Sequence, residues 1–552
     1  MSEAKSCKRC NVSFEITEDD LAFYEKISPT FDGQKFAIPA PTLCPQCRQQ
    51  RRLAFRNERS LYRRTCDASG KQIISMYSPD KPYKVYDQKI WWSDSWDAME
   101  YGREFDFSKT FTQQFGELMR EVPRIAMVIS FCENCDYAPY CTRSKGCYMS
   151  ISCVESENIL YSYQTNHSQK CVDSEISYYC QHCYEVVCSD HLYDCQYCVY
   201  CKDSHHLSFC RDCIGCEYCL GCVNLTHKKY CILNQQVTPE EFKIYKDSLI
   251  ENEKQAELLH HYSSLLQKIS KPDNHIINCV DVTGSFLINS SHCKECYNAE
   301  NLEYCAYVHT LPGGAKYCYD IQYSPRAEYV YNSLSAVDSN YSQFLLHSRA
   351  NSFCYYVDEC YYNQHCFWCI WLRNKSYCIF NKQYTKEEYE KTVAKIIAHM
   401  QETPTKSGQA CERGEFFDPS LSPFGYNETV AQEYYPCSVI ARSDNDEAIH
   451  DYDRSPHFAR DDGGLELSQF GFTRSTYEAP KPQSDKIVLA KDLPDTIIEV
   501  TDDILQYAIQ CEVTGKLFRI QPQELAFYRK HNIPLPRKHP DQRHLERLAL
   551  RK

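Results

Sequence analysis

Four cysteines near the start of the chain have the spacing of a structural zinc site. Cys7 and Cys10 form one Cys-x-x-Cys doublet, and Cys44 and Cys47 form a second. Zinc takes four soft or borderline ligands at tetrahedral corners, and each doublet places two thiolates on one side of the ion. Two doublets complete the coordination, which predicts a structural rather than a catalytic zinc. Two redox or packing pairs are the alternative, but paired doublets favour the metal.

A denser cysteine run occupies the middle of the chain and is a second candidate metal site. Thiols at two-residue gaps are typical of iron–sulfur ligands, but Leu220 follows Cys219 where such clusters carry a proline. Zinc bound between neighbouring turns of the chain and loose storage of many metal ions are further alternatives. The run consists of Cys195, Cys198, Cys201, Cys210, Cys213, Cys216, Cys219 and Cys222.

An internal copy of this region favours packing over metal binding for most of these thiols. At one constant offset along the chain, Cys198 becomes Leu345 and Cys210 becomes Val357. A metal ligand cannot be exchanged for leucine or valine, whereas a buried thiol behaves as a small hydrophobe and can be. We therefore expect most central cysteines to fill the interior. An iron–sulfur or thiol-redox protein remains the alternative hypothesis.

Arginines recur at helical spacing after the second doublet and again at the carboxy terminus. Residues at intervals of three and four share one face of a helix. The guanidinium fork suits phosphates and carboxylates alike, which indicates a nucleic-acid backbone or another acidic partner. Pairing with the chain's own acidic groups, or a solvated face, is the alternative, and the net charge of −13 favours it. The two Arg stripes are Arg48, Arg52, Arg56, Arg59 and Arg63, and Arg543, Arg547 and Arg551.

Catalytic residues are not identified by any motif in the chain. The sequence contains no P-loop, dinucleotide fingerprint, nucleophile elbow, HExxH helix or EF-hand loop. Several histidines lie among the central cysteines, but nothing distinguishes one thiol as a nucleophile. Absence of motifs lowers the odds of an enzyme without excluding one.

The two ends of the chain resemble each other. Residues 7–26 align with 511–530, and 41–57 align with 536–552. Cys7 aligns with Cys511, but the other three ligand positions are occupied by Thr514, His539 and Gln542. The carboxy terminus is therefore interpreted as a ribbon copy that has lost its metal while keeping its arginines. CDASGK at 66–71 is a third, partial copy.

The middle of the chain is duplicated at the offset that relates Cys198 to Leu345. The blocks 126–236 and 273–384 are rich in Tyr, Val, Ile and Cys, which favours strands. Cysteine doublets in the first block recur at equal intervals, beginning at Cys180, Cys195 and Cys210, and a short period of this kind is typical of a solenoid. Each block runs into a helix, with Thr238 and Thr385 placed as N-caps and glutamates three positions later.

Taken together, these patterns predict a multidomain, β-rich protein (α+β overall). It has an N-terminal zinc ribbon, two duplicated Cys/Tyr-rich β-solenoid-like blocks joined by helices, and a degenerate C-terminal ribbon copy. The predicted segments are 1–64 (ribbon), 65–125 (connector), 126–236 (block 1), 237–272 (helix), 273–384 (block 2), 385–403 (helix), 404–508 (linker, mobile at 443–464) and 509–552 (ribbon copy). Lacking an apolar signal or membrane span, the chain is expected to be cytoplasmic, with reduced thiols.

The N-terminal segment resembles the probable zinc-ribbon domain family. The shared features are the two doublets, Phe14, the segment 21–24, Pro45 inside the second doublet and Arg48 directly after it. The whole chain is similar to a group of uncharacterised bacterial cysteine-rich zinc-ribbon proteins, and this resemblance implies no particular activity. We expect a zinc-binding, non-enzymatic interaction scaffold with one structural Zn²⁺, whose arginines contact an acidic macromolecule, RNA and DNA included. Its oligomeric state and biological process are not indicated.

Overall fold

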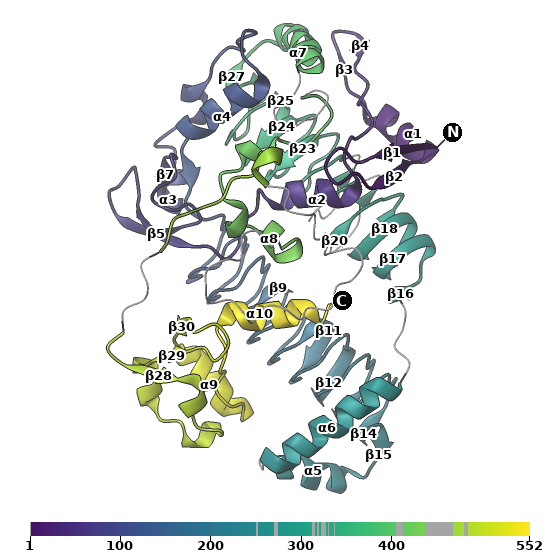
Figure 1. Cartoon of the computed structure of the whole chain (residues 1–552), viewed down its shortest axis with the longest axis vertical. Coiled ribbons are helices and arrows are strands. Elements are labelled where there is room, and N and C mark those ends of the chain that lie inside the picture. Colours follow the sequence, from purple (N-terminus) through teal and green to yellow (C-terminus); the bar gives the residue numbers. More distant parts are fainter. Residues whose placement is uncertain are drawn as a thin grey trace. The chain divides into compact units, whose positions relative to one another are not determined.

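The computed structural model describes residues 2–249, 252–269, 274–311, 315–316, 319–321, 327–328, 330–335, 337–403, 412–436, 467–479 and 484–551. The chain divides into two compact units, each built from two separate stretches (Figure 1). The first unit contains Met1–Ala126 and Pro272–Tyr477, and the second contains Met127–Lys271 and Glu478–Lys552. The predicted mobile segment 443–464 lies outside the described residues.

The N-terminal ribbon consists of two small hairpins and two helices. Thr17 caps the first helix, and Asp20 completes a capping box with it. Pro45 occupies the first turn of the second helix, where its missing N–H costs nothing. The elements are β1 (Glu3–Ser6), β2 (Ser13–Ile16), α1 (Glu18–Ile27), β3 (Thr30–Phe31), β4 (Gln34–Lys35) and α2 (Pro45–Leu53).

The connector after the ribbon packs against block 2. Trp91 is completely buried, and its ring lies 4.4 Å from that of Trp371, centroid to centroid. The elements are β5 (Tyr62–Thr65), β6 (Gln72–Ser75), β7 (Val85–Tyr86), α3 (Gln88–Trp91), η1 (Ala98–Tyr101), α4 (Phe111–Glu121) and β8 (Arg124–Ile125).

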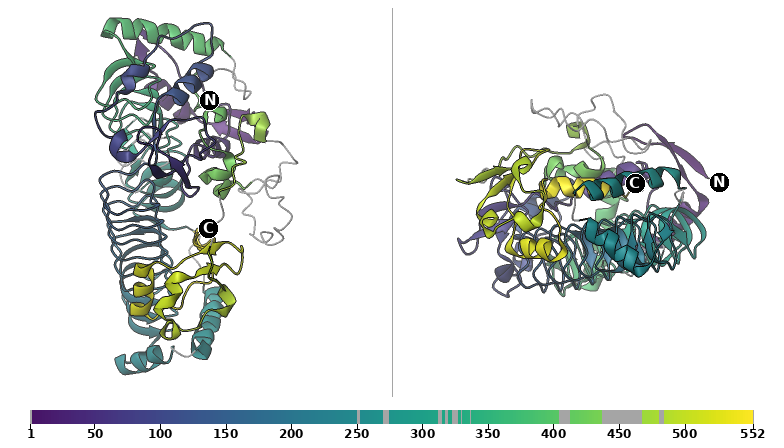
Figure 2. Two further views of the ribbon diagram at one scale, coloured as in Figure 1. Left: turned by 90° about the vertical axis from the view of Figure 1, so that its left-hand side faces the viewer. Right: turned by 90° about the horizontal axis from the view of Figure 1, so that it is seen from below.

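Block 1 is a stack of parallel strands in which each turn pairs with the next at a constant interval. Glu175 pairs with Val187, for example, and Asp190 pairs with Lys202. Figure 2 shows the successive turns lying one on the next. The strands are β9 (Tyr163–Asn166), β10 (Glu175–Tyr178), β11 (Val187–Tyr193), β12 (Lys202–Ser208), β13 (Glu217–Leu220), β14 (Lys229–Ile232) and β15 (Gln235–Gln236).

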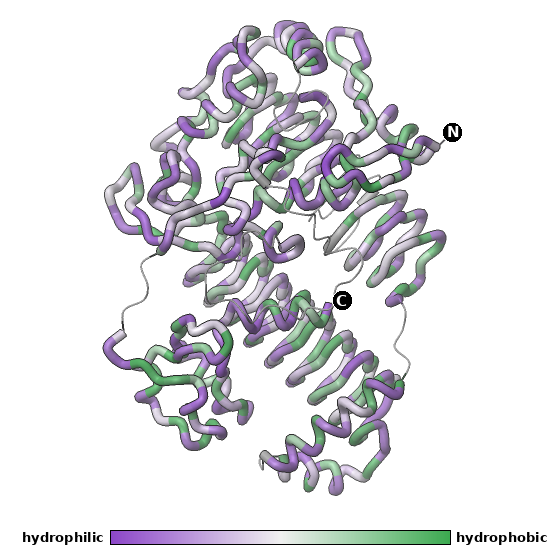
Figure 3. Tube along the Cα trace, viewed as in Figure 1, coloured by the Kyte–Doolittle hydropathy of each residue, from purple (hydrophilic) through white to green (hydrophobic). Residues whose placement is uncertain are grey.

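A three-residue rule fixes where each side chain of block 1 points. Every third residue from Phe131 to Leu233 has a positive φ, and most of these residues are not glycine. Each such residue turns the chain, and the residue after it faces inward. From Ala138 to Cys222, every third residue is at most 4% exposed. Hydrophobic and hydrophilic residues accordingly alternate over short distances along the turns (Figure 3).

The interior of block 1 is narrow, which explains its composition. One turn contributes only four inward side chains, and these are mostly cysteine and serine. The hydroxyl of Ser156 accepts a hydrogen bond from the backbone N–H of Ser168 at 3.2 Å, and the hydroxyl of Ser168 accepts one from Cys180 at 3.0 Å. Hydrogen bonds of this kind to the neighbouring turn satisfy most of the buried hydroxyls, although those of Thr165 and Ser174 have no such partner. The interval between successive cysteine doublets, for example from Cys180 to Cys195, equals the length of one turn plus one three-residue step to the next inward position.

Block 2, in the first unit, follows the same rule from Asn332 to Phe380. Earlier in the block the pairing interval varies, as between Ile276 and Leu287 and between Leu302 and Ala315. Gln343 pairs in parallel with Tyr355, at the same interval as the strands of block 1. The strands are β16 (Ile276–Ile277), β17 (Val280–Ile288), β18 (Ser291–Glu300), β19 (Leu302–Glu303), β20 (His309–Leu311), β21 (Ala315–Lys316), β22 (Ala327–Glu328), β23 (Gln343–Leu346), β24 (Tyr355–Asp358), β25 (Gln364–Phe367), β26 (Ser376–Ile379) and β27 (Lys382–Gln383).

Each block ends in an antiparallel strand and a helix. β15 and β27 reverse direction against the preceding strand, so the parallel stack stops there. The capping boxes expected at Thr238 and Thr385 are confirmed, with Glu241 and Glu388 as their partners. The helices are α5 (Pro239–Ser248) and α6 (Asn252–Lys268) after block 1, and α7 (Lys386–Glu402) after block 2.

The remaining elements complete the two units. In the first unit they are η2 (Pro419–Leu421), η3 (Tyr426–Glu428), α8 (Val430–Tyr434) and η5 (Leu467–Phe470). In the second they are β28 (Ile487–Leu489), η6 (Ala490–Asp492), η7 (Ile497–Glu499), η8 (Asp502–Gln506), β29 (Ala508–Gln510), β30 (Leu517–Phe518), α9 (Pro522–His531) and α10 (Pro540–Ala549). The described residues thus form a mixed α/β, multidomain protein with many parallel strands. Among the described helices, none combines the length and apolar character that a bilayer crossing requires.

Candidate metal centre

The four cysteines of the predicted zinc site meet in the N-terminal ribbon. Their Sγ atoms all lie within 4.8 Å of one another. Cys7, Cys44 and Cys47 are buried and Cys10 is partly buried. In the part of the chain that the structure describes, this is the one group of three or more His, Cys, Asp or Glu residues whose ligand atoms approach so closely.

Local backbone geometry brings the two doublets together. The Cys7 N–H donates to the Val12 carbonyl and the Asn11 N–H to the Cys7 carbonyl, both at 2.9 Å. Asn11 has φ of 57°, a left-handed conformation that asparagine adopts more readily than most residues. The Lys8 N–H donates to the Thr42 carbonyl at 3.1 Å, which ties the first doublet to the segment before the second.

The spacing of the thiols matches a tetrahedral zinc. A Zn–S bond of about 2.3 Å places neighbouring sulfurs about 3.8 Å apart. The Sγ atoms of Cys10 and Cys44 are separated by 3.7 Å. Cys44 is the N-cap of α2 and makes no side-chain capping bond, so its sulfur is free to ligate. The donor set and its geometry therefore fit one structural zinc ion.

The electrostatics of the quartet also favour a cation. Hydrogen bonds from Cys44 and then Cys47 hold the pKa of Cys7 well below its ordinary value. Contacts with Cys10, Cys44 and Cys7 push the pKa of Cys47 well above its ordinary value. The thiols cannot all ionise side by side, because the negative charge of each thiolate disfavours ionisation of its neighbours. A divalent cation would remove that opposition and allow four thiolates.

Two further turns have the same backbone geometry without the quartet. The Cys66 N–H donates to the Lys71 carbonyl at 2.8 Å, and the Cys511 N–H donates to the Lys516 carbonyl at 2.9 Å. His539 is the N-cap of α10, as Cys44 is of α2. The turn is thus preserved where the ligands are not, which supports the interpretation of 509–552 as a ribbon copy.

The central cysteines lie inside block 1 as packed thiols, and neighbouring thiols contact one another, as Cys198 does Cys195, Cys201 and Cys210. All eight members of the Cys195–Cys222 run are at most 1% exposed. The Cys210 thiol contacts the Ser208 and Cys219 carbonyls at 3.4 and 3.5 Å, and the rest of the run lies similarly against backbone carbonyls. Leu345 and Val357, at the equivalent places of block 2, are also fully buried. This arrangement favours packing, and a second metal site there stays a prediction.

The first Arg stripe points into the protein rather than away from it. Arg48 and Arg52 are 2% and 1% exposed. Arg48 Nε lies 2.6 Å from Asp320 Oδ2, and Arg52 Nη1 lies 3.4 Å from Asp320 Oδ1. Arg52 also donates to Asn332 Oδ1 at 2.7 Å. The partners of these arginines are thus side chains of block 2.

The later members of that stripe do not share a helix with the first two. α2 ends at Leu53, so the expectation of one continuous helical face is wrong. Arg56 pairs with Glu58, and Arg59 Nε lies 3.6 Å from Glu433 Oε1. Arg63 lies in β5 and is exposed. Of the five arginines, only Arg63 presents an exposed side chain.

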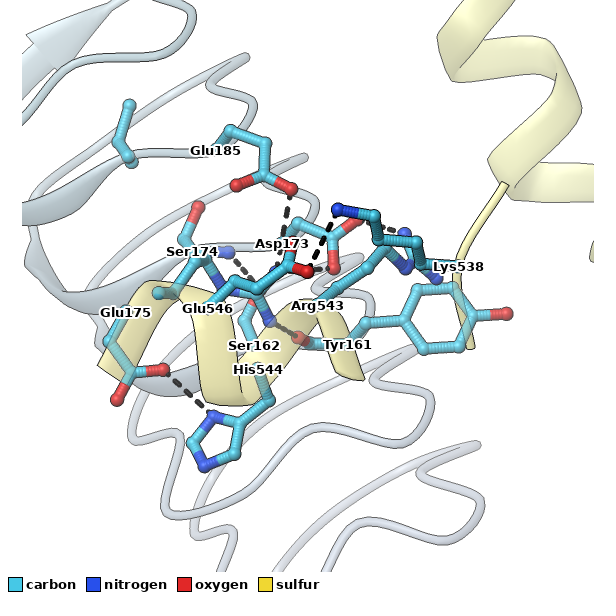
Figure 4. A network of polar contacts seen from close by, with 12 residues as sticks. Tyr161, Ser162, Asp173, Ser174, Glu175, Glu185, Lys538, Arg543, His544 and Glu546 are labelled. Carbon is cyan, nitrogen blue, oxygen red and sulfur yellow. Dashed lines mark hydrogen bonds and ion pairs between the residues drawn. The ribbon is translucent and has the colours of Figure 1, made fainter. Parts of the chain in front are cut away.

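The second Arg stripe makes the equivalent contacts in the second unit. Arg543 pairs with Asp173, and Arg547 Nη1 lies 2.8 Å from the same carboxylate. Arg551 Nη1 lies 3.1 Å from Glu175 Oε1. Figure 4 shows α10 lying over the turns of block 1, with these acidic groups between them. The acidic groups that these arginines contact are thus the chain's own carboxylates, and an external acidic partner stays a prediction.

Arg51, Glu415, His544 and Glu175 also take part in these networks and were not predicted from the sequence. Arg51 of α2 donates to Glu415 Oε2 at 2.8 Å. His544 of α10 lies 3.0 Å from Glu175. Burial would raise the pKa of Glu175, but His544, Arg551 and Arg547 lower it to about 2. The internal repeat carried a usable signal for the main pair, because Asp173 and Asp320 are related by the offset of the two blocks.

Comparisons with known proteins do not identify a family. No family model matches the chain, and no curated protein matches it. Among solved structures, a proposed acetyltransferase from Desulfovibrio desulfuricans G20 matches 52% of this chain and 75% of its own, with 8% identity and a TM-score of 0.10. A TM-score that low carries no argument about fold or activity. The quartet fits a zinc-ribbon-like site, and membership of a zinc-ribbon family stays a prediction.

Proposed function

We propose that this protein is a zinc-stabilised, non-enzymatic scaffold. The observation that supports it best is the buried quartet of Cys7, Cys10, Cys44 and Cys47, whose sulfurs lie within 4.8 Å of one another. Four protein thiolates fill the tetrahedral positions of zinc and leave none for a reacting water. The ion would therefore act on folding rather than on catalysis.

The zinc would hold α2 in the position from which its arginines contact Asp320 of block 2. Cys44 caps the helix and Cys47 lies in its first turn, so two of the four ligands belong to the start of α2. Arg48 follows Cys47 directly and reaches Asp320 at 2.6 Å. Loss of the ion would release the start of the helix and weaken the contact between ribbon and block.

The two blocks would serve as rigid platforms, and we infer that each is a β-solenoid, with turns of constant length in block 1 and turns of varying length in the early part of block 2. The equal intervals between paired strands in block 1 and in the later part of block 2 support this, as does the regular inward position of every third residue of block 1. An external acidic partner, RNA or DNA included, also remains a prediction. Its affinity should fall steeply between low and moderate salt, and unchanged binding would exclude nucleic acid.

Metal content with an optical spectrum tests the proposal against its rivals. Wild-type protein purified without oxygen should be colourless and carry one zinc per chain. Visible absorbance with bound iron would support the iron–sulfur alternative that uses the Cys195–Cys222 run. Many zinc or copper ions per chain would support metal storage instead. Either result would reject a single structural zinc.

A further inference from the structure

Each ribbon packs against the block that is farther from it in the sequence, not against the adjacent one. The N-terminal ribbon is followed in the sequence by block 1, yet it shares a compact unit with block 2. The C-terminal ribbon copy follows block 2 and shares a unit with block 1. Each half of the chain, 1–271 and 272–552, therefore holds a ribbon and a block that are not partners of each other.

The two ribbon–block contacts are equivalent residue by residue. Arg48 and Arg543 occupy matching places in the ribbon copies, and Asp320 and Asp173 match in the block copies. Arg48 pairs with Asp320, and Arg543 pairs with Asp173. The duplicated halves have thus kept the same Arg–Asp contact while exchanging partners.

A contact between two tyrosine rings is also equivalent in the two ribbon–block interfaces. The rings of Tyr24 and Tyr331 lie 5.1 Å apart at 71°, edge to face. Those of Tyr528 and Tyr184 lie 5.7 Å apart at 81°. Tyr24 and Tyr528 match in the ribbon copies, and Tyr331 and Tyr184 match in the block copies. Two independent contacts therefore support the same docking geometry.

The charged groups of the Arg–Asp contacts are buried, so breaking a contact carries a large energetic cost. Asp173 and Asp320 are fully buried, and the arginines that face them are at most 4% exposed. A buried charge that has lost its partner strongly destabilises the protein. Separation of a block from its ribbon would therefore require that its buried aspartate be rehydrated.

The helices also differ at the places that would distinguish one block from the other. His544 of α10 bonds Glu175 at 3.0 Å, and the matching residue of α2 is Gln49. Arg51 of α2 matches Glu546 of α10, so the two helices carry opposite charges there. Exchanging the ribbons would remove one of the two partners of Glu175, His544, and reverse a charge, which favours the observed pairing.

We propose that each half of the chain is a binding module whose partner is the other half. Two reciprocal ribbon–block interfaces hold the halves together, and the peptide link between them is not needed for association. The protein is thus a heterodimer of duplicated halves carried on one chain. This goes beyond the proposed scaffold, and its readout, fragment association, is separate from zinc content.

Cleavage of the full chain tests the proposal directly. A protease recognition sequence is inserted between Lys271 and Pro272, where the two units exchange stretches. After cleavage under native conditions, both fragments should elute together at the size of the uncut chain and separate only in denaturant. Elution as two separate species without denaturant would overturn the proposal.

Substitutions then show whether the Arg–Asp contacts hold the fragments. The double variant Asp173→Asn and Asp320→Asn should raise the dissociation constant of the cleaved fragments by on the order of a hundredfold or more. Arg143→Met is the matched control, because Arg143 and its partner Glu155 are 51% and 41% exposed. Fragments of the double variant that associate as tightly as the control would contradict the proposal.

A milder pair of substitutions covers the case in which the double variant does not fold. Arg48→Lys with Arg543→Lys keeps both charges but loses the planar guanidinium fork. The cleaved fragments should then associate measurably more weakly than those of Arg143→Met. Equal association would show that the arginines do not hold the halves, and would overturn the proposal.

Discussion

Arg48 lies one residue after the zinc-quartet member Cys47 and places its Nε atom 2.6 Å from Asp320 Oδ2. The two paired residues are 272 positions apart in the sequence, and both side chains are almost completely buried. One short helix therefore connects the candidate metal centre to the interface between ribbon and block. The predictions below follow from this connection and from its counterpart in the second unit.

Asp320→Asn should strongly destabilise the first unit. The substitution leaves Arg48 and Arg52 buried without their carboxylate, which should cost about 3–5 kcal/mol in the free energy of unfolding. Asp338→Asn is the control, because Asp338 is 49% exposed and lies 3.9 Å from Arg349. That change should cost less than about 1 kcal/mol. Equal effects in denaturant titrations would contradict the assigned role of Asp320.

The second unit should lose stability in acid through Glu175. The pKa of this buried carboxyl is about 2, below its ordinary value of 4.5. Its ionised form therefore stabilises the fold above about pH 4.5, and this contribution, about 3 kcal/mol, disappears as the pH falls toward 2.

Acid unfolding of a variant checks that prediction. Glu175→Gln should be less stable than wild type at neutral pH and should lose less stability between pH 4.5 and 2, as followed by circular dichroism. Glu157→Gln, at an exposed position of the same block, is the control and should behave as wild type. Identical acid profiles for all three proteins would show that Glu175 does not carry the effect.

The central thiols should be replaceable by the residues of the other block. Cys198→Leu with Cys210→Val introduces the side chains that stand at the equivalent places of block 2, where both are fully buried. Zinc content should stay the same, and the free energy of unfolding should change by on the order of 1–2 kcal/mol through altered packing. Loss of bound metal from this variant would reveal a second metal site among the central thiols and contradict their assignment to packing.

The candidate site was predictable where the signal is local. Cys7, Cys10, Cys44 and Cys47 show their spacing directly, and the structure brings them together. The burial of Leu345 and Val357 followed from the internal repeat in the same way. The cysteine quartet and the burial of these two residues could both be predicted from residue types that recur at fixed intervals in the sequence.

The partners of the arginines were not predictable by the same means. Helical spacing indicates which residues share a face but not what that face meets, and Asp320 is far from Arg48 in the sequence. The length of the repeating turn in the two blocks could not be predicted from the sequence for a different reason. Its corners require a positive φ, which usually signals glycine, but residues such as Tyr197 and His206 adopt it here. Stacked rings in successive turns and the buried interior offset that strain.

Zinc per chain in a quartet variant is the most direct test of a structural zinc. Cys44→Ser removes one ligand, whereas Cys66→Ser removes a buried thiol from a turn of the same geometry that lacks the quartet. Wild type and Cys66→Ser should each carry one zinc per chain, and Cys44→Ser should carry none after dialysis against a chelator. A Cys44→Ser protein that retains its zinc under those conditions would contradict the assignment of the metal to the ribbon.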